Sequence, residues 1–278
     1  IYYPQNSLKA TTCLEGRQHL YSYLKSKNIK HNKCGKFIVS TSPNEEEYLA
    51  ELLRRGKING LNELEIISGK TAKKIEPELF CTAALFSKET GIFDSHSFML
   101  SLQCDLEENG GQVIFNSKAS SIEIVDNRKF RIEVEAEIPY TILCSNLIIA
   151  AGLYTHKIVH LIKGFPKFYI PQLHLAKGSY FSYISETPFQ HLIYPLPTSG
   201  GLGIHATHDL HRRLRFGPDV EWLSDNNPDL INYTVDPLSS DDFYNSVRKY
   251  WPGIKKDKLI ADYSLSLIHI SEPTRPER

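Results

Sequence analysis

The sequence lacks an excess of charge of either sign, because its 32 basic residues balance 32 acidic ones. No bulk electrostatic field therefore recruits nucleic acid or anionic lipid. It also lacks an apolar run long enough to span a bilayer, since the longest, around Leu143–Leu153, is interrupted by Ser145 and Asn146. These residues therefore form no transmembrane helix, although peripheral membrane contact is left open.

Paired cysteines are also absent. The sequence has five cysteines, an odd number; they are widely spaced, and no two of them form a CxxC motif. This pattern argues against a disulfide framework and against a cysteine zinc site. It predicts a reducing intracellular compartment: cytoplasmic or membrane-associated in a bacterium, mitochondrial in a eukaryote.

What is present predicts an α+β protein. Helical patterns occur at residues 7–27 and 96–109, with Ser7 as a cap and Gly110 as a stop. Residues 143–150 form a continuously apolar run that predicts a buried strand. After residue 168, short strand patterns separated by Pro and Gly predict an antiparallel sheet. The order of elements predicts an α/β portion joined to an antiparallel-sheet domain.

The end of the apolar run offers one candidate ligand site. Ala150, Ala151 and Gly152 join the predicted strand to a predicted helix. Small side chains let a flat ligand approach the backbone, and a helix start presents free N–H donors. A tight packing corner between strand and helix explains the same residues.

The stretch Gly201–Ala206 matches GxGxxA, but its surroundings argue against a dinucleotide fingerprint. A Pro-rich segment precedes it and no crossover helix pattern follows, so we interpret it as a glycine-kinked strand. His205 lies in this strand pattern, where a neutral imidazole can act as general base or be a structural histidine. His208 and His211 fall in a polar turn, and we predict no metal site.

Basic residues next to aromatic ones are candidates for holding an acidic substrate. Lys177 precedes Gly178-Ser179-Tyr180, and Arg215 precedes Phe216. Carboxylate recognition uses such donors. A solvated surface charge is the ordinary alternative for any single Lys or Arg.

Taken together, the segments resemble the L-2-hydroxyglutarate dehydrogenase group of the D-amino-acid oxidase-like flavoenzymes. The resemblance covers residues 1–264. The stretches that carry it are IYYP, GKFIV, IEPEL, TGIFDSH, AAGLY, KGSYF, YPLP, GLGIH, RFGPD and YWPG.

The resemblance implies an FAD enzyme that oxidises L-2-hydroxyglutarate to 2-oxoglutarate by hydride transfer to flavin N5. It implies that Ala150, Ala151 and Gly152 contact FAD, and that His205 and Tyr194 lie near the flavin face as catalytic residues. Lys177, Tyr180 and Arg215 are the expected substrate-binding residues. The electron acceptor, oxygen or a quinone, stays open.

The same resemblance implies a division of the chain. Residues 1–35 and 96–165 are expected to form part of an FAD-binding domain, and residues 36–95 and 166–264 a substrate domain. The family's GxGxxG unit is expected upstream of the segment matching Ile1, and residues 265–278 do not follow the family pattern. We therefore expect the isolated chain to bind FAD weakly.

Two alternatives remain open from the sequence. The flavin fold is also compatible with an amino acid or amine substrate, although the RFGPD and YWPG stretches resemble the hydroxy-acid group. The other alternative is an inactive fragment of such an enzyme.

Overall fold

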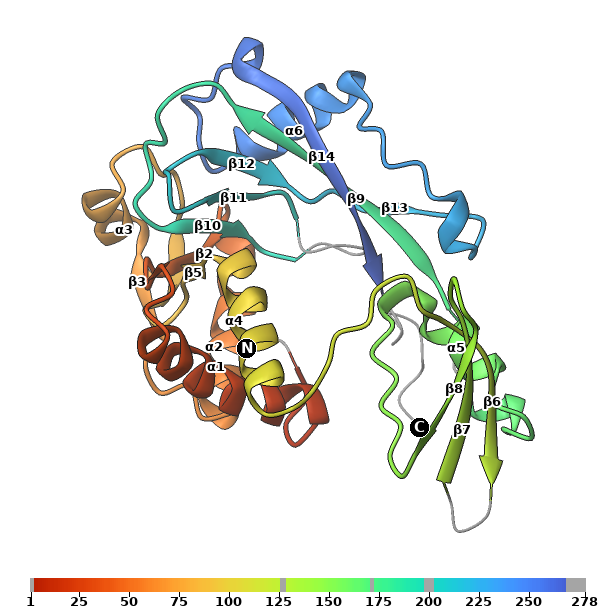
Figure 1. Cartoon of the computed structure of the whole chain (residues 1–278). Coiled ribbons are helices and arrows are strands. Elements are labelled where there is room, and N and C mark those ends of the chain that lie inside the picture. Colours follow the sequence, from red (N-terminus) through yellow and green to blue (C-terminus); the bar gives the residue numbers. More distant parts are fainter. Residues whose placement is uncertain (1–2, 126–128, 171–172, 198–202, 269–278) are drawn as a thin grey trace. The chain divides into compact units, whose positions relative to one another are not determined.

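The computed structural model describes residues 3–125, 129–170, 173–197 and 203–268, and the chain divides into two compact units (Figure 1). The first unit comprises residues 1–102, 177–221 and 233–265, and the second comprises residues 103–176, 222–232 and 266–278. Residues 1–35 were expected to group with 96–165, whereas the contacts place the former in the first unit and most of the latter in the second. The assignment of these segments to a cofactor and a substrate domain stays a prediction.

The helices begin and end close to the predicted residues. Ser7 caps the first helix as expected, because its hydroxyl accepts a hydrogen bond from the Ala10 amide at 3.2 Å. Gly110 follows the helix predicted at 96–109 and has φ +78°, the left-handed conformation that glycine adopts readily. The α-helices are α1 (Leu8–Ser26), α2 (Glu46–Ile58), α3 (Gly69–Ile75), α4 (Ser95–Glu108), α5 (Thr155–His160) and α6 (Ser240–Val247).

Among the described residues, a nine-stranded sheet dominates the structure, with the order β13-β9-β12-β11-β10-β2-β4-β3 and β14 paired to β9. The sheet is mixed rather than purely antiparallel, because β10 pairs in parallel with β2, Ile193 opposite Phe37. Its strands are β2 (Lys36–Ser40), β3 (Glu65–Ser68), β4 (Ala83–Ser87), β9 (Leu175–Tyr183), β10 (Leu192–Pro195), β11 (His205–His208), β12 (Leu214–Gly217), β13 (Glu221–Trp222) and β14 (Leu259–Ile268). A separate pair joins β1 (His31–Asn32) to β5 (Ile92–Phe93).

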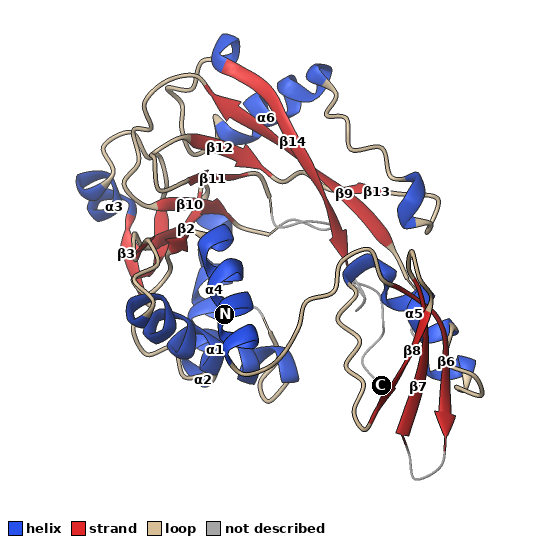
Figure 2. Ribbon diagram, in the orientation of Figure 1, coloured by secondary structure: helices blue, strands red, loops and turns tan. Residues whose placement is uncertain are grey.

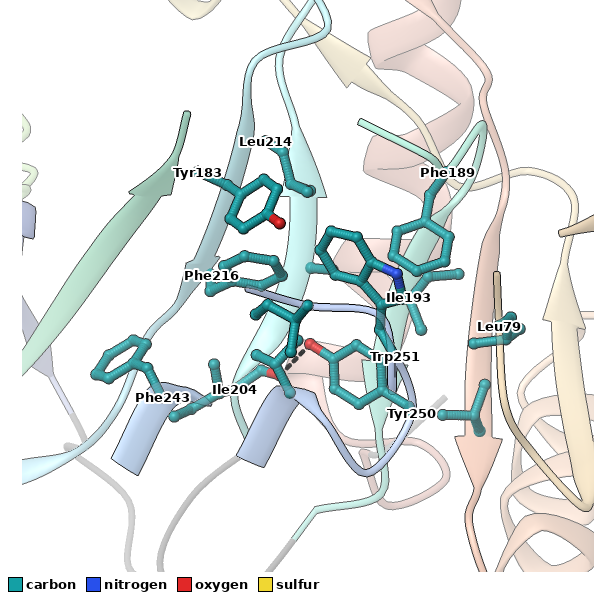
Figure 3. Packing of buried hydrophobic residues seen from close by; sticks show 14 of the residues in the cluster. Leu79, Tyr183, Phe189, Ile193, Ile204, Leu214, Phe216, Phe243, Tyr250 and Trp251 are labelled. Carbon is teal, nitrogen blue, oxygen red and sulfur yellow. Dashed lines mark hydrogen bonds between the residues drawn. The ribbon is translucent and has the colours of Figure 1, made fainter. Parts of the chain in front are cut away.

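One face of this sheet carries the main hydrophobic core. Successive strands place apolar side chains in one row across this face, each opposite the next: Phe37, Ile193, Ala206, Phe216 and Phe181. Helix α6 and the segment after it cover the row with side chains that include those of Phe243, Tyr250 and Trp251 (Figure 3). Since side chains alternate along a strand, the neighbouring residues of the same strands face the other way.

The opposite face is apolar over one part of the sheet. Leu49 and Leu52 of α2 pack against Ile38 and Leu85 in a second buried cluster. Helix α2 lies over β2, β3 and β4. The same face continues across β10, β11, β12 and β9, where it carries Tyr194, His205, Arg215 and Tyr180.

Replacing Tyr250 by phenylalanine is expected to lower the free energy of unfolding by about 1–3 kcal/mol. The buried Tyr250 hydroxyl donates to the carbonyl of Ile204 at 3.0 Å, so its loss leaves that buried acceptor unpaired (Figure 3). Urea unfolding would measure the change. Tyr48→Phe, at a partly exposed tyrosine, is the matched control, and equal losses in both variants would contradict the prediction.

In the second unit, three of the described strands form a sheet of their own in the order β6-β7-β8 (Figure 2). They are β6 (Lys118–Val125), β7 (Lys129–Glu135) and β8 (Tyr140–Cys144). The predicted strand at 143–150 is therefore wrong beyond Cys144. Residues 146–150 pair with none of the described strands, and Ile148 is 88% exposed, because an apolar run becomes a buried strand only where a neighbouring strand and a covering layer exist.

No helix in the part of the chain that the structure describes is both long enough and apolar enough to cross a membrane.

Candidate functional site

Four residues from four strands form one row on the face of the large sheet opposite α6. In register across the strands, Tyr194 of β10 lies opposite His205 of β11, which lies opposite Gly217 of β12, which lies opposite Tyr180 of β9. The hydrophobic row of the core lies directly behind them on the other face. The sheet thus brings together three predicted site residues that are separated in sequence.

Tyr194 and His205 make the closest ring contact of this row. Their ring centroids are 3.6 Å apart and their planes differ by 10°, so the phenol and imidazole are stacked. His205 is 5% exposed, and burial raises the pKa of Tyr194. The tyrosine therefore stays a neutral phenol at physiological pH beside an imidazole that is shielded from bulk water.

Tyr180 extends the row toward the C-terminal strand of the unit. Its ring stacks on Tyr263 of β14, with centroids 4.8 Å apart and an angle of 14° between the planes. Burial is the main cause that raises the Tyr180 pKa, and the neighbouring phenols of Tyr263 and Tyr194 add to it. Tyr180 is therefore a neutral phenol rather than a phenolate at physiological pH.

The position of Tyr180 depends on the absence of a side chain at Gly217. A Cβ built there would lie 2.7 Å from the Tyr180 ring and 2.7 Å from the carbonyl oxygen of Ser179, and the Gly217 φ is +141°. The tyrosine ring therefore lies over the glycine backbone, a contact that any other residue would prevent.

Gly217→Ala is expected to lower the free energy of unfolding by about 1–3 kcal/mol, because the backbone angle is unfavourable for alanine and the new Cβ collides with Ser179 and Tyr180. Gly16→Ala is the matched control. Gly16 lies within helix α1, and a Cβ added there would meet nothing within 4 Å, so alanine is expected to stabilise by about 0.5–1 kcal/mol. Thermal unfolding of both variants measures the difference, and destabilisation by Gly16→Ala alone would contradict the argument.

Arg215 lies on the same face, in the row next to that of His205. Its Nε donates to Asp262 at 2.9 Å, and its Nη1 lies 3.7 Å from Asp209. The guanidinium carbon is 5.8 Å from the Tyr263 ring centroid. Two carboxylates already balance this cation, so a substrate carboxylate would have to compete with them.

Lys177 points to the other face. It is two positions from Ser179 and four from Phe181 on β9, so its side chain lies on the core side of the sheet. Its ammonium is 2.9 Å from Glu221 and 3.4 Å from the carbonyl of Thr234. These contacts favour the structural alternative that the sequence left open, and the substrate-binding role of Lys177 stays an untested prediction.

The structure also shows the surroundings of the GxGxxA stretch and of the histidines that follow it. His205 and His208 lie on β11, and a turn then leads into β12. The glycine motif is therefore not followed by a crossover helix. Gly201 and Leu202 lie outside the described residues. His208 Nε2 contacts the Gln190 carbonyl at 3.0 Å. Among the described residues, no three His, Cys, Asp or Glu side chains are grouped closely enough to hold a metal.

Comparison with known proteins identifies the family. The sequence matches the family model described as "DAO: FAD dependent oxidoreductase" over residues 1–266. The chain belongs to this family. Among known structures, the L-alpha-glycerophosphate oxidase of Mycoplasma pneumoniae has a TM-score of 0.80 at 19% identity, covering 95% of this chain and 69% of that one. Glycine oxidase from Geobacillus kaustophilus has a TM-score of 0.73 at 13% identity, covering 96% and 68%. At these identities the likeness shows the fold alone.

Several similar sequences within the FAD dependent oxidoreductases are named L-2-hydroxyglutarate dehydrogenase. The mitochondrial L-2-hydroxyglutarate dehydrogenase of Arabidopsis thaliana is 36% identical over 298 residues, which covers 95% of this chain and 62% of the relative. The human enzyme of the same name is 31% identical, covering 79% and 50%, and the one from Escherichia coli K12 is 27% identical, covering 79% and 51%. The chain thus spans about half to three fifths of the length of these relatives.

The predicted cofactor-contacting residues of the FAD dependent oxidoreductase lie in the second unit. Ala150 and Gly152 are exposed and Ala151 is half-buried. Gly152 has φ +54°, and a Cβ there would meet nothing within 4 Å. The segment is therefore an open corner of small residues whose backbone a flat or extended ligand can approach, which fits part of an FAD contact.

Lys36 is a residue of this face that the sequence did not predict as a site residue, although it lies in the stretch GKFIV. It begins β2, and its Nζ lies 4.7 Å from the centroid of the Tyr194 ring. The signal available in the sequence was a single lysine at the start of the otherwise apolar strand KFIVS. Only the pairing of β2 with β10, which joins residues more than 150 positions apart, brings it to the row of His205.

Proposed function

We propose that the protein to which this chain belongs oxidises the 2-hydroxyl group of L-2-hydroxyglutarate to give 2-oxoglutarate, and that the first unit carries its substrate-binding face. The observation that carries the proposal is the stacked Tyr194–His205 pair on the polar face of the sheet in a chain of the FAD dependent oxidoreductase family. The names of its relatives supply the substrate.

The oxidation removes a hydride from C2 and a proton from the 2-hydroxyl, which leaves a C=O double bond. When bound, FAD supplies the two-electron acceptor for such a reaction. An imidazole nitrogen of His205 accepts the hydroxyl proton, since histidine is suited to this task near neutral pH. Stacking on Tyr194 fixes the imidazole plane, and burial keeps water away from it.

Tyr194 and Tyr180 donate hydrogen bonds to the substrate in this proposal. Their raised pKa values keep both phenols protonated, and a protonated phenol is a donor to a carboxylate or carbonyl oxygen. Ala150, Ala151 and Gly152 are the proposed backbone contacts of FAD. The compartment and the electron acceptor remain the predictions made from the sequence.

The test is an anaerobic titration of the flavin-containing full-length protein with L-2-hydroxyglutarate, followed by flavin absorbance. Bleaching of the oxidised flavin band with formation of one 2-oxoglutarate per flavin supports the proposal. A protein bleached instead by glycine, sarcosine or another amino acid, and not by 2-hydroxy acids, would contradict it.

A further inference from the structure

Lys36 lies beside the candidate catalytic pair without belonging to it. Strand β10 runs between β2 and β11, so Lys36 and His205 reach the Tyr194 ring from the strands on its two sides. The imidazole centroid is 3.6 Å from the ring centroid, and the Lys36 ammonium is 4.7 Å from it. A small molecule that lies across the Tyr194 side chain would therefore have an imidazole at one end and a cation at the other.

Lys36 is partly buried, and no carboxylate among the described residues forms an ion pair with it. Burial alone lowers its pKa to about 8, with no neighbouring acid contributing. Arg215, which lies on the same face as His205, is paired with Asp262. An amine with a pKa of about 8 is mostly protonated at pH 7, so Lys36 carries a positive charge. Within the described structure, its contact with the Tyr194 ring is the interaction that offsets the cost of removing this charge from water.

A bound anion would supply the missing counter-charge. The proposed substrate has two carboxylates, one beside the reacting carbon and one at the far end of a five-carbon chain. With the 2-hydroxyl at His205, the chain can cross Tyr194 toward Lys36. We infer that Lys36 binds the distal carboxylate of the substrate and thereby makes the enzyme selective for a 2-hydroxy dicarboxylic acid over a monocarboxylic one. This inference rests on the proposed function.

A merely structural role for Lys36 makes a different prediction. If its ammonium only holds the Tyr194 ring through a cation–π contact, its removal would disturb Tyr194 and impair every substrate alike. A carboxylate-binding role impairs only substrates that carry the distal carboxylate. The comparison of two acids of equal chain length therefore separates the two roles.

The experiment measures kcat/KM of the full-length flavin-containing enzyme with L-2-hydroxyglutarate and with L-2-hydroxypentanoate, in which a methyl group replaces the distal carboxylate. Lys36→Met is expected to lower kcat/KM for the diacid roughly 10- to 100-fold, mainly through KM, because one charge-assisted interaction is lost. The value for the monoacid should stay within about twofold. Lys36→Arg should recover most of the diacid preference, and Lys74→Met on exposed α3 is the matched control.

Binding of glutarate, an unreactive diacid, provides a readout that does not depend on turnover. Isothermal titration calorimetry should give a Kd raised roughly 10- to 100-fold by Lys36→Met and unchanged by Lys74→Met. Unchanged diacid preference in Lys36→Met, or an equal loss with both acids, would overturn the inference while leaving the proposed function intact. A wild-type enzyme that oxidises neither acid would overturn the proposed function, whereas the glutarate titration would still report on Lys36.

Discussion

Glu76→Ala is expected to lower the free energy of unfolding by about 3–5 kcal/mol, because it leaves several hydrogen-bond donors without their buried acceptor. Glu76 is 1% exposed. Its Oε1 accepts hydrogen bonds from the backbone amides of Gln190 and His191, at 2.9 and 2.8 Å, and from His191 Nδ1 at 2.6 Å. Because a carboxylate only accepts, Nδ1 must carry the hydrogen.

Removing this carboxylate leaves three donors unpaired at the entrance to β10, the strand that carries Tyr194. Glu76→Gln keeps an acceptor oxygen and should lose only part of the stability. Glu78→Ala, two residues further on and exposed, is the control and should change the free energy of unfolding by less than about 0.5 kcal/mol. Urea unfolding followed by tryptophan fluorescence measures all three, and a Glu76→Ala loss no larger than that of Glu78→Ala would refute the argument.

Glu76 also shows why the contacts of the site are hard to predict from sequence. The segment at residues 70–79 predicts a short helix that ends near Pro77, and α3 (Gly69–Ile75) is observed there. Nothing local indicates that its acidic residue binds the backbone 114 and 115 positions later. The local pattern therefore predicts the helix but not the buried interaction that makes one of its flanking residues essential.

The same limit applies to the candidate site itself. Short strand patterns separated by Pro and Gly predicted a sheet after residue 168, and His205 was correctly expected within one such pattern. The row of four site residues depends on the register between their strands. These residues are Tyr194, His205, Gly217 and Tyr180, on β10, β11, β12 and β9. A shift of one residue would turn a side chain to the opposite face, and no single-strand pattern specifies that register.

The register also explains the different positions of the two basic residues singled out from sequence. Lys177 and Arg215 each precede an aromatic stretch, and the two motifs look equivalent along the chain. In the sheet, Lys177 faces the core side with Glu221, whereas Arg215 faces the side of His205. Lys36, which was not predicted as a site residue, lies 4.7 Å from the Tyr194 ring centroid because β2 and β10 are adjacent.

His205→Gln is expected to lower kcat/KM for L-2-hydroxyglutarate roughly 10²- to 10⁴-fold, the usual contribution of a general base. Glutamine is similar in size and polar, so it fills much of the space beside Tyr194 but cannot accept a proton. In steady-state kinetics, the wild-type enzyme should lose activity as pH falls and the imidazole becomes protonated. The variant should lack this acidic limb, because the group that titrates is gone.

Two controls separate proton transfer from structure in this experiment. Tyr194→Phe keeps an aromatic ring that can stack on the His205 imidazole, and this variant should retain the acidic limb of the pH profile. His211→Gln, at an exposed turn position, should match the wild type. Flavin absorbance establishes that each variant holds the same amount of cofactor, so that a loss of rate is a loss of catalysis. If His205→Gln retained activity within about threefold of wild type at equal flavin content, the imidazole would not be the base, and the stacked pair would serve only to shape the substrate face.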